Sequence, residues 1–324
     1  MISPDDEQAQ MKVVGLSKHF VVKSQGKKTM LKAVSDVSFS VRKGETFSIV
    51  GESGCGKSTL GRCLARLLEP SAGQVIFEGS DIVQLKDDTL RELRKKIQFI
   101  FQDPYSSMNP RMRIKSVLSE PMRNFGVTPQ NIVKRLEELL RLVSLQQDSL
   151  DKFPNQFSGG QRQRLVIARA LALEPNFIVC DEPVSALDVS VQAQVINLLV
   201  DLQKRLQLTY LFISHDLSVV RHISHKVAVM YLGRIVEVGT RDEIFNTPRH
   251  PYTRALMAAV PQFSAEGQKM PKELRLSGEI PSPLAPPSGC AFRTRCPKAQ
   301  PICAQSAPET RQFSRDHIVA CHFA

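Results

Sequence analysis

One stretch, Gly51-Glu-Ser-Gly-Cys-Gly-Lys-Ser58, limits the folds open to this chain more than any other. It matches the phosphate-binding pattern G-x-x-x-x-G-K-[ST] at every fixed position. The apolar run Glu45–Val50 before it predicts a buried strand, and Thr59–Leu68 after it has apolar residues at helical spacing. In such a strand–loop–helix context, backbone N–H groups surround phosphate oxygens at a helix N-terminus. The stretch therefore predicts an α/β fold with a phosphate-binding site.

The side chains of this loop have separate expected tasks. Lys57 is expected to neutralise the β- and γ-phosphates of a nucleotide, and the Ser58 hydroxyl to hold Mg²⁺. Cys55 lies beside Lys57 at the start of the predicted helix, which makes it a candidate reactive thiol without a catalytic role. The residues expected to contact the nucleotide here are Gly51, Glu52, Ser53, Gly54, Cys55, Gly56, Lys57, Ser58 and Thr59.

Composition narrows the class of protein and its location. The 324 residues are enough for one large domain and a smaller one. No apolar run reaches the roughly 18 residues of a membrane span, and the acidic Met1–Glu7 is no targeting signal, so we expect the cytoplasm. The net charge of +11 points to acidic partners. Nucleic acid is not expected among them, because no basic block with interleaved aromatic residues occurs.

The order of predicted elements indicates how the chain is organised. An antiparallel β portion comes first, then a helical insert over about 111–157, then alternating helices and short apolar strands, which favour a parallel sheet. The composition becomes irregular and proline-rich after Pro261. Strands are expected at 11–16, 34–41 (after a hairpin loop at 25–28), 73–79, 95–102, 176–180, 209–213, 226–231 and 234–238, and helices at 131–143, 160–173 and 190–206.

Two adjacent carboxylates, Asp181 and Glu182, end the apolar run Phe177–Cys180. Both are expected to belong to the strand, where consecutive side chains point in opposite directions, so the two carboxylates can take different tasks. Asp181 suits Mg²⁺, directly or through water. Glu182 suits a general base that polarises a water for attack on the γ-phosphorus. The alternative is a charged strand end in a turn.

A second candidate anion site lies at Ser158-Gly-Gly-Gln161, which precedes the helix predicted from Arg162. Glycines at a helix N-terminus and a serine hydroxyl supply donors for a phosphate. Because the chain has one phosphate loop, this second site would complete the nucleotide pocket of another copy or of a sibling chain. A plain helix cap is the alternative.

Together these motifs resemble the nucleotide-binding subunits of ABC transporters. Gly51–Ser58 is similar to the Walker A loop, Val179–Glu182 to the end of Walker B, and Ser158–Gln161 to the signature motif, with Phe157 where Leu is usual. The resemblance implies a P-loop NTPase fold of the ABC type, with an antiparallel β subdomain, a helical subdomain and a small irregular C-terminal extension that contains cysteines.

The resemblance also assigns further residues. Gln102 resembles the Q-loop glutamine that touches Mg²⁺ and faces the permease, and Ser185–Asp188 resembles the D-loop. His215 resembles the switch histidine on the γ-phosphate. Phe20 falls where the family has the aromatic residue that stacks on adenine; a core phenylalanine is the alternative.

The tail narrows the resemblance to one branch of the family. His250–Leu256 and Pro281–Pro287 look like the C-terminal extension of dipeptide/oligopeptide transporters. This implies an ATP-binding domain over 11–247, with a helical subdomain over about 103–172, and an extension over 248–324. It also implies an ATPase that powers peptide import from the cytoplasmic face of the inner membrane. The implied partners are a sibling ATPase, two transmembrane permease subunits and an extracytoplasmic peptide-binding protein.

Four of the seven cysteines lie in the last 35 residues: Cys290, Cys296, Cys303 and Cys321, separated by 5, 6 and 17 residues. A reducing compartment favours metal binding over disulfides. The resemblance implies a [4Fe–4S] cluster, whose negative charge Arg293, Arg295 and Lys298 would offset. Zinc is the alternative, although structural zinc sites usually begin with a tighter cysteine pair.

Two alternative functions stay open at this point. The same motor can serve another cargo, such as nickel or a metallophore, glutathione or antimicrobial peptides, because the ATPase does not touch the cargo. A non-transport ABC ATPase that acts on DNA or ribosomes is less favoured. Such proteins usually carry two ATPase units in one chain or a long coiled-coil insert.

Overall fold

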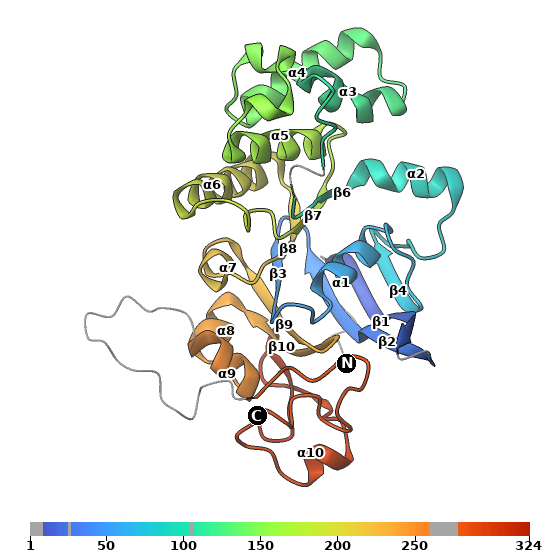
Figure 1. The fold of residues 1–324 in the computed structure, drawn as a ribbon, viewed down its shortest axis with the longest axis vertical. Coiled ribbons are helices and arrows are strands. Elements are labelled where there is room, and N and C mark those ends of the chain that lie inside the picture. The colour runs from blue at the N-terminus through green and yellow to red at the C-terminus, as the bar shows by residue number, and fades with distance from the viewer. Residues whose placement is uncertain (1–8, 25–26, 104–106, 259–277) are drawn as a thin grey trace, which may run out of the picture. The chain divides into compact units, whose positions relative to one another are not determined.

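A computed structural model describes residues 9–24, 27–103, 107–258 and 278–324. The chain divides into two compact units (Figure 1). Unit 1 comprises residues 1–42, 46–83 and 214–324, and unit 2 comprises residues 43–45 and 84–213. The expected hairpin turn at Gln25-Gly26 and the predicted change of composition at Pro261 lie outside the described residues.

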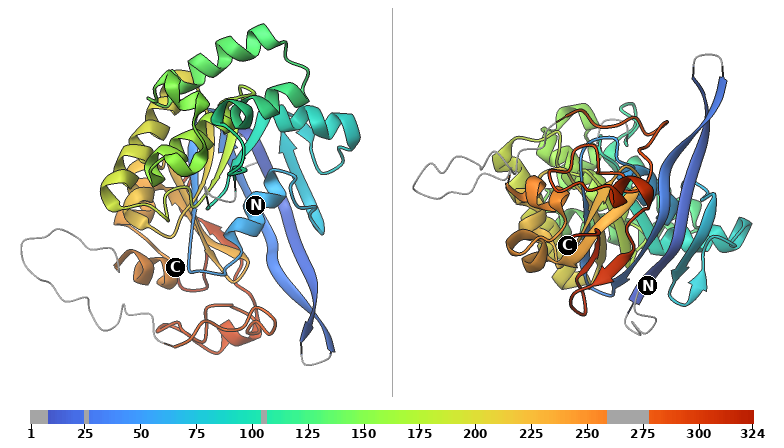
Figure 2. Two further views of the ribbon diagram at one scale, coloured as in Figure 1. Left: turned by 45° about the horizontal axis from the view of Figure 1, so that its top comes forward. Right: turned by 90° about the horizontal axis from the view of Figure 1, so that it is seen from below.

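Unit 1 contains a four-stranded antiparallel sheet in the order β2-β1-β4-β5. Its strands are β1 (Ala9–Ser24), β2 (Lys27–Arg42), β4 (Ala72–Phe77) and β5 (Ser80–Asp81). β1 and β2 form a long twisted hairpin, drawn as the two blue strands in the right panel of Figure 2. Apolar residues on one face of this sheet, such as Val13 and Val75, are fully buried. The predicted β portion is therefore present.

The second sheet of unit 1 carries the phosphate loop. Its strands follow the order β11-β12-β10-β9-β3, with β3 parallel to β9 and the others antiparallel. The strands are β3 (Thr46–Val50), β9 (Lys226–Tyr231), β10 (Arg234–Thr240), β11 (Thr310–Gln312) and β12 (Ile318–Ala320). The helices are α1 (Lys57–Leu64), α7 (Leu217–Ile223), α8 (Arg241–Asn246), α9 (Pro251–Ala258) and α10 (Ile302–Gln305).

Unit 2 contains three parallel strands in the order β8-β7-β6 together with the helical insert. All residues of β7 and β8 are buried, as a sheet covered on both faces requires. The strands are β6 (Ile97–Ile100), β7 (Phe177–Asp181) and β8 (Thr209–Ile213). The helices are α2 (Asp87–Lys96), α3 (Ile114–Asn124), α4 (Pro129–Leu142), α5 (Gly159–Leu171) and α6 (Val189–Leu206), with 3₁₀ turns at Gln147–Asp151 and Pro154–Gln156.

One predicted strand is partly wrong. The segment 95–102 was expected to be a single buried strand, but its first two residues end helix α2 and only Ile97–Ile100 is extended. The sequence does carry signals for α2. Asp87 and Asp88 lie in its first turn and three basic residues lie in its last, an arrangement that complements the helix dipole.

The tail is less irregular than predicted, because β12 pairs with β10 and so extends the second sheet of unit 1. The tail has few buried apolar residues of its own, and Phe292 instead packs against Tyr231 and Tyr252. Among the helices of the described ranges, none combines the length and apolarity needed to cross a bilayer.

Candidate nucleotide site

Two glycines let the phosphate loop lie directly against neighbouring backbone in unit 1. Gly51 has φ +150° and Gly56 has φ +106°. A Cβ at Gly51 would lie 2.2 Å from the Met230 carbonyl oxygen, and one at Gly56 would lie 2.1 Å from the Ala33 carbonyl oxygen. No real side chain fits at those distances, so the loop's path past β2 and β9 requires glycine at both positions.

Helix α1 begins directly after this loop, at Lys57. Its N-cap residue is Gly56, and no side chain caps the helix, which leaves this end suited to an anion. Lys57 is 5% exposed, and its Nζ donates to the carbonyl oxygens of Gly51 at 2.8 Å and Glu52 at 3.1 Å. The charge is thus held inside the turn of the loop, where the pattern predicts it.

Cys55 is not the activated thiol that its position suggested. The side chain is 5% exposed, and this burial raises the pKa of the thiol above its ordinary value. The Lys57 ammonium, with Nζ 3.9 Å from Sγ, lowers that pKa by less than burial raises it. Cys55 therefore stays protonated at neutral pH, and this prediction was wrong.

Glu52 has two contacts that no sequence pattern indicated. Its backbone N–H donates to the Tyr252 hydroxyl at 2.9 Å, and its carboxylate accepts two hydrogen bonds from Arg295 at 2.6 and 2.9 Å. Both partners belong to the C-terminal part of unit 1. Both partners lie in segments that stood out in the sequence for other reasons. Tyr252 lies in His250–Leu256, which resembles the transporter extension, and Arg295 lies beside Cys296, where it was expected to offset the charge of a cluster.

The other predicted site residues of unit 1 lie at element ends or in the hairpin. His215 is exposed and follows Ser214, whose backbone N–H donates to the Ile49 carbonyl at 3.3 Å. Asp216 then caps helix α7 by accepting from Ser218 and Val219. Phe20 is half-exposed on β1, with the Lys18 ammonium 5.1 Å from its ring centre, so it is not a core residue.

Unit 2 brings Gln102 and Glu182 together. Gln102 Nε2 donates to Glu182 Oε2 at 3.0 Å, although 80 residues separate them in the chain. β6 and β7 pair in parallel, so their carboxyl ends meet at one edge of the sheet. Asp181 is the last residue of β7 and is 2% exposed.

The expected reason for the different directions of Asp181 and Glu182 was wrong. Glu182 is not a strand residue: it has φ +47°, in the left-handed region that non-glycine residues rarely adopt. Its backbone N–H donates to the Ile213 carbonyl at 2.9 Å, which fixes this turn. The carboxylate is therefore directed by a strained turn, of the kind that clusters at functional sites, and not by strand alternation.

Ser158 and Gln161 form a reciprocal cap at the start of α5. The Gln161 N–H donates to Ser158 Oγ at 3.3 Å, and the Ser158 N–H donates to Gln161 Oε1 at 3.1 Å. Both residues are exposed. The helix-cap alternative thus describes the geometry within this chain, and the exposed position leaves these residues accessible to another chain.

The two glycines of this segment pack against the residues that follow β7. A Cβ at Gly160 would lie 2.4 Å from Val191 Cγ1, and one at Gly159 would lie 3.2 Å from Leu187 Cδ2. Leu187 belongs to the predicted Ser185–Asp188 segment, in which Ser185 Oγ donates to the Glu182 carbonyl at 3.1 Å. Close packing within unit 2 therefore joins the start of α5 to the chain after Glu182.

Three of the four C-terminal cysteines have thiol pKa values that are raised by burial and by other cysteines of this group. Burial is the main cause that raises the pKa of Cys290, and Cys303, Cys321 and Cys296 raise it further. A backbone N–H two residues later bonds three of the sulfurs: that of Phe292 to Cys290, that of Lys298 to Cys296, and that of Phe323 to Cys321 at 3.4 Å. Such bonds stabilise thiolates that bind a cluster. Nevertheless, in the described ranges no group of three or more ligand side chains is arranged to hold a metal ion.

The fold and the site define an ATP-binding-cassette ATPase, and comparison with known proteins agrees. The model of the ABC transporter family matches residues 34–185, and the model described as "Oligopeptide/dipeptide transporter, C-terminal region" matches residues 236–303. An oligopeptide transport ATP-binding protein of Bacillus subtilis, AppF, is 51% identical over 312 residues, which is 95% of each chain. A probable peptide ABC transporter ATP-binding protein of Sinorhizobium fredii is 50% identical over 97% of this chain and 90% of its own. The chain therefore belongs to the ATP-binding subunits of the oligopeptide/dipeptide ABC transporter family.

Solved structures give the same fold. A dimeric ATP-binding cassette in a post-hydrolysis state, bound to ADP and Pi, is 28% identical with a TM-score of 0.64, over 71% of this chain and 98% of its own. CbiO1 of Clostridium perfringens, part of the ABC transporter complex cbiONQ, is 28% identical with a TM-score of 0.65, over 74% of this chain and 92% of its own. The predicted fold class and family are thus confirmed. The chain is an ATPase coupled to transport, a class that uses ATP and Mg²⁺, dimerises and works with permease subunits.

Proposed function

We propose that this chain hydrolyses ATP to power the import of dipeptides and oligopeptides across the cytoplasmic membrane, as a translocase subunit on the inner membrane's cytoplasmic face. One observation carries the proposal. This chain is 51% identical to a relative named for oligopeptide transport, and the match covers 95% of both chains. The C-terminal region also matches the model of the oligopeptide/dipeptide transporter C-terminal region. Nickel, metallophore, glutathione or antimicrobial-peptide transport has no comparable support, and neither has action on nucleic acid.

In the proposed site, residues 51–59 bind the phosphates, with Lys57 on the β- and γ-phosphates. Ser58, Asp181 and Gln102 would hold Mg²⁺, and Phe20 would stack on the adenine ring. Its half-exposed ring on β1 is accessible for such a contact. His215, exposed beyond the end of β8, would contact the γ-phosphate.

Glu182 is the proposed general base. The left-handed turn and the hydrogen bond from Gln102 hold its carboxylate in one orientation. A base must lie within hydrogen-bond reach of the water that it polarises, so an imposed orientation favours catalysis. Gln102 would act as a positioning residue for Glu182 in addition to its contact with Mg²⁺.

The reaction cycle needs a second ATPase subunit, which we propose is a sibling chain. Ser158, Gly159, Gly160 and Gln161 would close over ATP held by the sibling's phosphate loop, and the sibling's equivalents would close over ATP in this chain. The exposure of Ser158 and Gln161 in this chain supports that role. ATP binding would close the dimer, and hydrolysis would reopen it.

A hollow of about 330 Å³ in unit 2 is the proposed docking site for a cytoplasmic helix of one of two permease subunits. It begins beside Gln102, because Phe101 and Phe99 line it with their ring centres 4.5 Å apart. Phe125 adds apolar surface, and the ion pair between Arg169 and Glu120 at 3.0 Å adds a polar wall. A helix bound there would contact Phe99 and Phe101, so a shift of the Gln102 segment would move that helix.

Phe125→Ala tests the docking proposal because this residue lies outside the catalytic machinery. The variant should co-purify with the permease several-fold less than the wild type, while the isolated chain keeps its ATPase rate. Val133→Ala, at an exposed apolar position of α4, is the matched control. Equal recovery of the permease by both variants would refute the docking site.

We also propose that Cys290, Cys296, Cys303 and Cys321 hold a [4Fe–4S] cluster, with zinc as the alternative occupant. The N–H bonds to three sulfurs and the electrostatic effect of the other three cysteines on Cys290 support this proposal. The group would serve as a structural staple for the extension. Anaerobically purified protein should contain about four irons and absorb at roughly 400 nm. Cys296→Ser should lose both signals and Cys63→Ser neither, whereas one zinc per chain would decide for zinc.

The division into an ATP-binding domain over 11–247 and an extension over 248–324 also stays a proposal. An extracytoplasmic peptide-binding protein would deliver the cargo. Identification of the cargo bound by the protein encoded beside this chain would test the assignment to peptides.

The decisive experiment on the ATPase is Glu182→Gln. Loss of a general base should lower turnover by at least about 100-fold while ATP binding is retained. Glu137→Gln, an exposed carboxylate on α4, is the control and should hydrolyse ATP normally. Normal hydrolysis by the Glu182→Gln variant would refute the assigned base.

A further inference from the structure

The C-terminal extension reaches the phosphate loop through one buried ion pair. Arg295 Nη1 donates to Glu52 Oε2 at 2.6 Å, and Nη2 donates to Glu52 Oε1 at 2.9 Å. The Arg295 side chain is 5% exposed and the Glu52 side chain 21% exposed. A paired, largely desolvated arginine–carboxylate fork is among the stronger polar contacts in proteins and fixes direction as well as distance.

Tyr252 holds the same loop residue at its backbone. Its hydroxyl accepts the Glu52 N–H at 2.9 Å, and the side chain is fully buried. The backbone N–H of Tyr252 in turn donates to His250 Nδ1 at 3.1 Å. Glu52 is therefore fixed at both its main chain and its side chain by residues that follow residue 248.

An aromatic cluster keeps these two partners in place. The ring centre of Phe292 lies 5.3 Å from those of Tyr231 and Tyr252, which are 4.8 Å from each other. The Arg295 guanidinium lies 5.9 Å from the Tyr231 ring centre. Phe292 and Arg295 come from one short segment between Cys290 and Cys296, so the position of Arg295 depends on how that segment packs.

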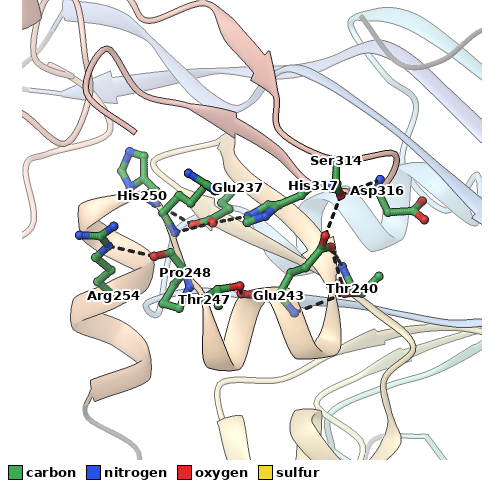
Figure 3. Close-up of polar contacts among 11 residues, drawn as sticks. Glu237, Thr240, Glu243, Thr247, Pro248, His250, Arg254, Ser314, Asp316 and His317 are labelled. Carbon is green, nitrogen blue, oxygen red and sulfur yellow. Dashed lines mark hydrogen bonds and ion pairs between the residues drawn. The ribbon is translucent and has the colours of Figure 1, made fainter.

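The far end of the extension is anchored separately, as Figure 3 shows. Glu237 of β10, 1% exposed, receives hydrogen bonds from His317 Nε2 at 2.7 Å and from the His250 N–H at 3.0 Å. Ser314 Oγ donates to Glu243 at 2.7 Å, and Asp316 accepts from Lys226 at 2.7 Å. The extension is thus fixed to β9, β10 and α8, and Arg295 has a firm support from which to hold the loop.

The contacts of Glu52 bear directly on Lys57. The Lys57 ammonium donates to the carbonyl oxygens of Gly51 and Glu52, the residue before the fork and the forked residue itself. The Glu52 carbonyl oxygen thus belongs to a residue whose N–H and carboxylate are held by the extension, and it also accepts from the Lys57 ammonium. The extension therefore contacts the loop at a residue that positions the Lys57 charge.

We propose that Arg295, together with Tyr252, is a positioning residue for nucleotide binding, by which the extension keeps the phosphate loop in its binding conformation. This rests on the proposed function in one respect, that the loop binds ATP. Pre-formed loops bind more tightly because less ordering is needed on binding. Release of Arg295 should accordingly weaken ATP binding without changing the chemical step.

The test measures the Kd of ATP and the ATPase rate at saturating ATP for four variants of the full chain. Arg295→Met should raise the Kd about tenfold, which corresponds to about 1.4 kcal/mol, while kcat changes by less than about twofold. Tyr252→Phe should raise the Kd by a smaller factor, and Arg295→Lys should restore part of the loss. Arg293→Met is the matched control, since Arg293 lies in the same segment but its guanidinium donates to Ser288 of the extension.

Two further measurements separate positioning from general damage. Hydrogen exchange of the peptide covering residues 50–58 should accelerate in Arg295→Met and not in Arg293→Met. In a Glu52→Gln background, Arg295→Met should add little to the Kd, because both changes remove one interaction. If Arg295→Met does not fold, Tyr252→Phe and Arg295→Lys carry the test.

Several outcomes would overturn the inference. An unchanged Kd in Arg295→Met, an equal loss in Arg293→Met, or fully additive effects with Glu52→Gln would each do so. A failure of the proposed function looks different. In that case the wild type does not bind ATP, or Lys57→Ala binds it as well as the wild type.

Discussion

The two helix N-termini that the sequence marked as anion sites, those of α1 and α5, are built in opposite ways. α1 follows Gly56 in a left-handed conformation, and no side chain caps it. α5 follows Ser158, which exchanges two hydrogen bonds with Gln161 and so caps the helix from within. The phosphate loop before α1 is held by contacts with β2, β9 and the extension. The segment before α5 is held by hydrogen bonds among its own residues 158–161.

This difference matches what each site has to do. The Lys57 side chain is buried, and its loop is supported by Gly56 against Ala33 and by Glu52 against Arg295. Such a loop is preorganised to bind ATP in the isolated chain, without a second subunit. Ser158 and Gln161 are exposed and satisfied by each other, so they gain little from an isolated phosphate. They suit a site that forms only when a second chain presents ATP.

The largest expected difference concerns the glycines. Gly56→Ala should destabilise the chain by about 3 kcal/mol, because the new Cβ meets backbone at 2.1 Å in a left-handed conformation. Gly160→Ala, whose Cβ meets only Val191 Cγ1, should cost less. Gly54→Ala is the control for backbone strain alone, because Gly54 also has a left-handed φ of +76° but no neighbouring atom lies within 4 Å of its Cβ; it should cost only about 1–2 kcal/mol. Urea unfolding measures all three, and equal losses for Gly54→Ala and Gly56→Ala would break the comparison.

Nucleotide affinity should separate the two sites next. A hydrogen bond to a charged group contributes about 1.5–3 kcal/mol, so Lys57→Ala should weaken ATP binding roughly 10- to 100-fold. Ser158→Ala should leave the affinity of the isolated chain unchanged and lower the turnover of the assembled transporter. A fluorescent ATP analogue and an ATPase assay measure the two quantities. A large loss of ATP affinity in the isolated Ser158→Ala chain would contradict the view that Ser158 serves only as a helix cap until a second chain binds.

Acid should lower the free energy of unfolding through His250, whose side chain accepts a hydrogen bond from Tyr252, a contact of the phosphate loop. Burial lowers the pKa of His250 to about 4 from an ordinary 6.5, so between these values the unfolded chain binds the proton more readily. Stability is therefore greatest above pH 6.5 and falls toward pH 4, by about 2 kcal/mol between pH 7 and 5.

Glu237 adds a loss in the same direction at lower pH. Burial acts to raise its pKa, but hydrogen bonds from His317 and from the backbone N–H groups of Arg249 and His250 lower it overall. Its contribution is present above the ordinary value of 4.5 and is lost as the pH falls below it. Urea unfolding at several pH values measures the slope. His250→Asn should flatten it and His222→Asn, at an exposed position, should not; equal slopes would contradict this account.

The smallest expected effect concerns the cap of α5. Ser158→Ala should lower stability by about 1 kcal/mol, because it removes the acceptor of the Gln161 N–H. Ser158→Asp keeps an acceptor at the cap and should preserve stability. Thermal unfolding decides, and an unchanged midpoint in Ser158→Ala would show that the cap contributes nothing.

Much of the fold was predictable because it depends on local pattern. Mostly apolar runs predicted β3, β7 and β8, and helical spacing predicted α4 and α6. Helix α2 was missed because its ten residues include only two apolar ones, so periodicity is weak and the end charges are the remaining signal. The length of the β1–β2 hairpin was also not predictable, since its outer part is mostly half-exposed.

At the candidate site, the motif residues were predictable and their supports were not. The sequence by itself determined the loop 51–58, its strand and helix, and the carboxylates at the end of β7, because each depends on neighbours within a few residues. Only the tertiary structure decided that Cys55 is buried with a raised thiol pKa, that Glu182 adopts a left-handed backbone conformation, and that Arg295 forms an ion pair with Glu52. Those facts depend on contacts between segments up to 243 residues apart, and long-range packing leaves no local pattern.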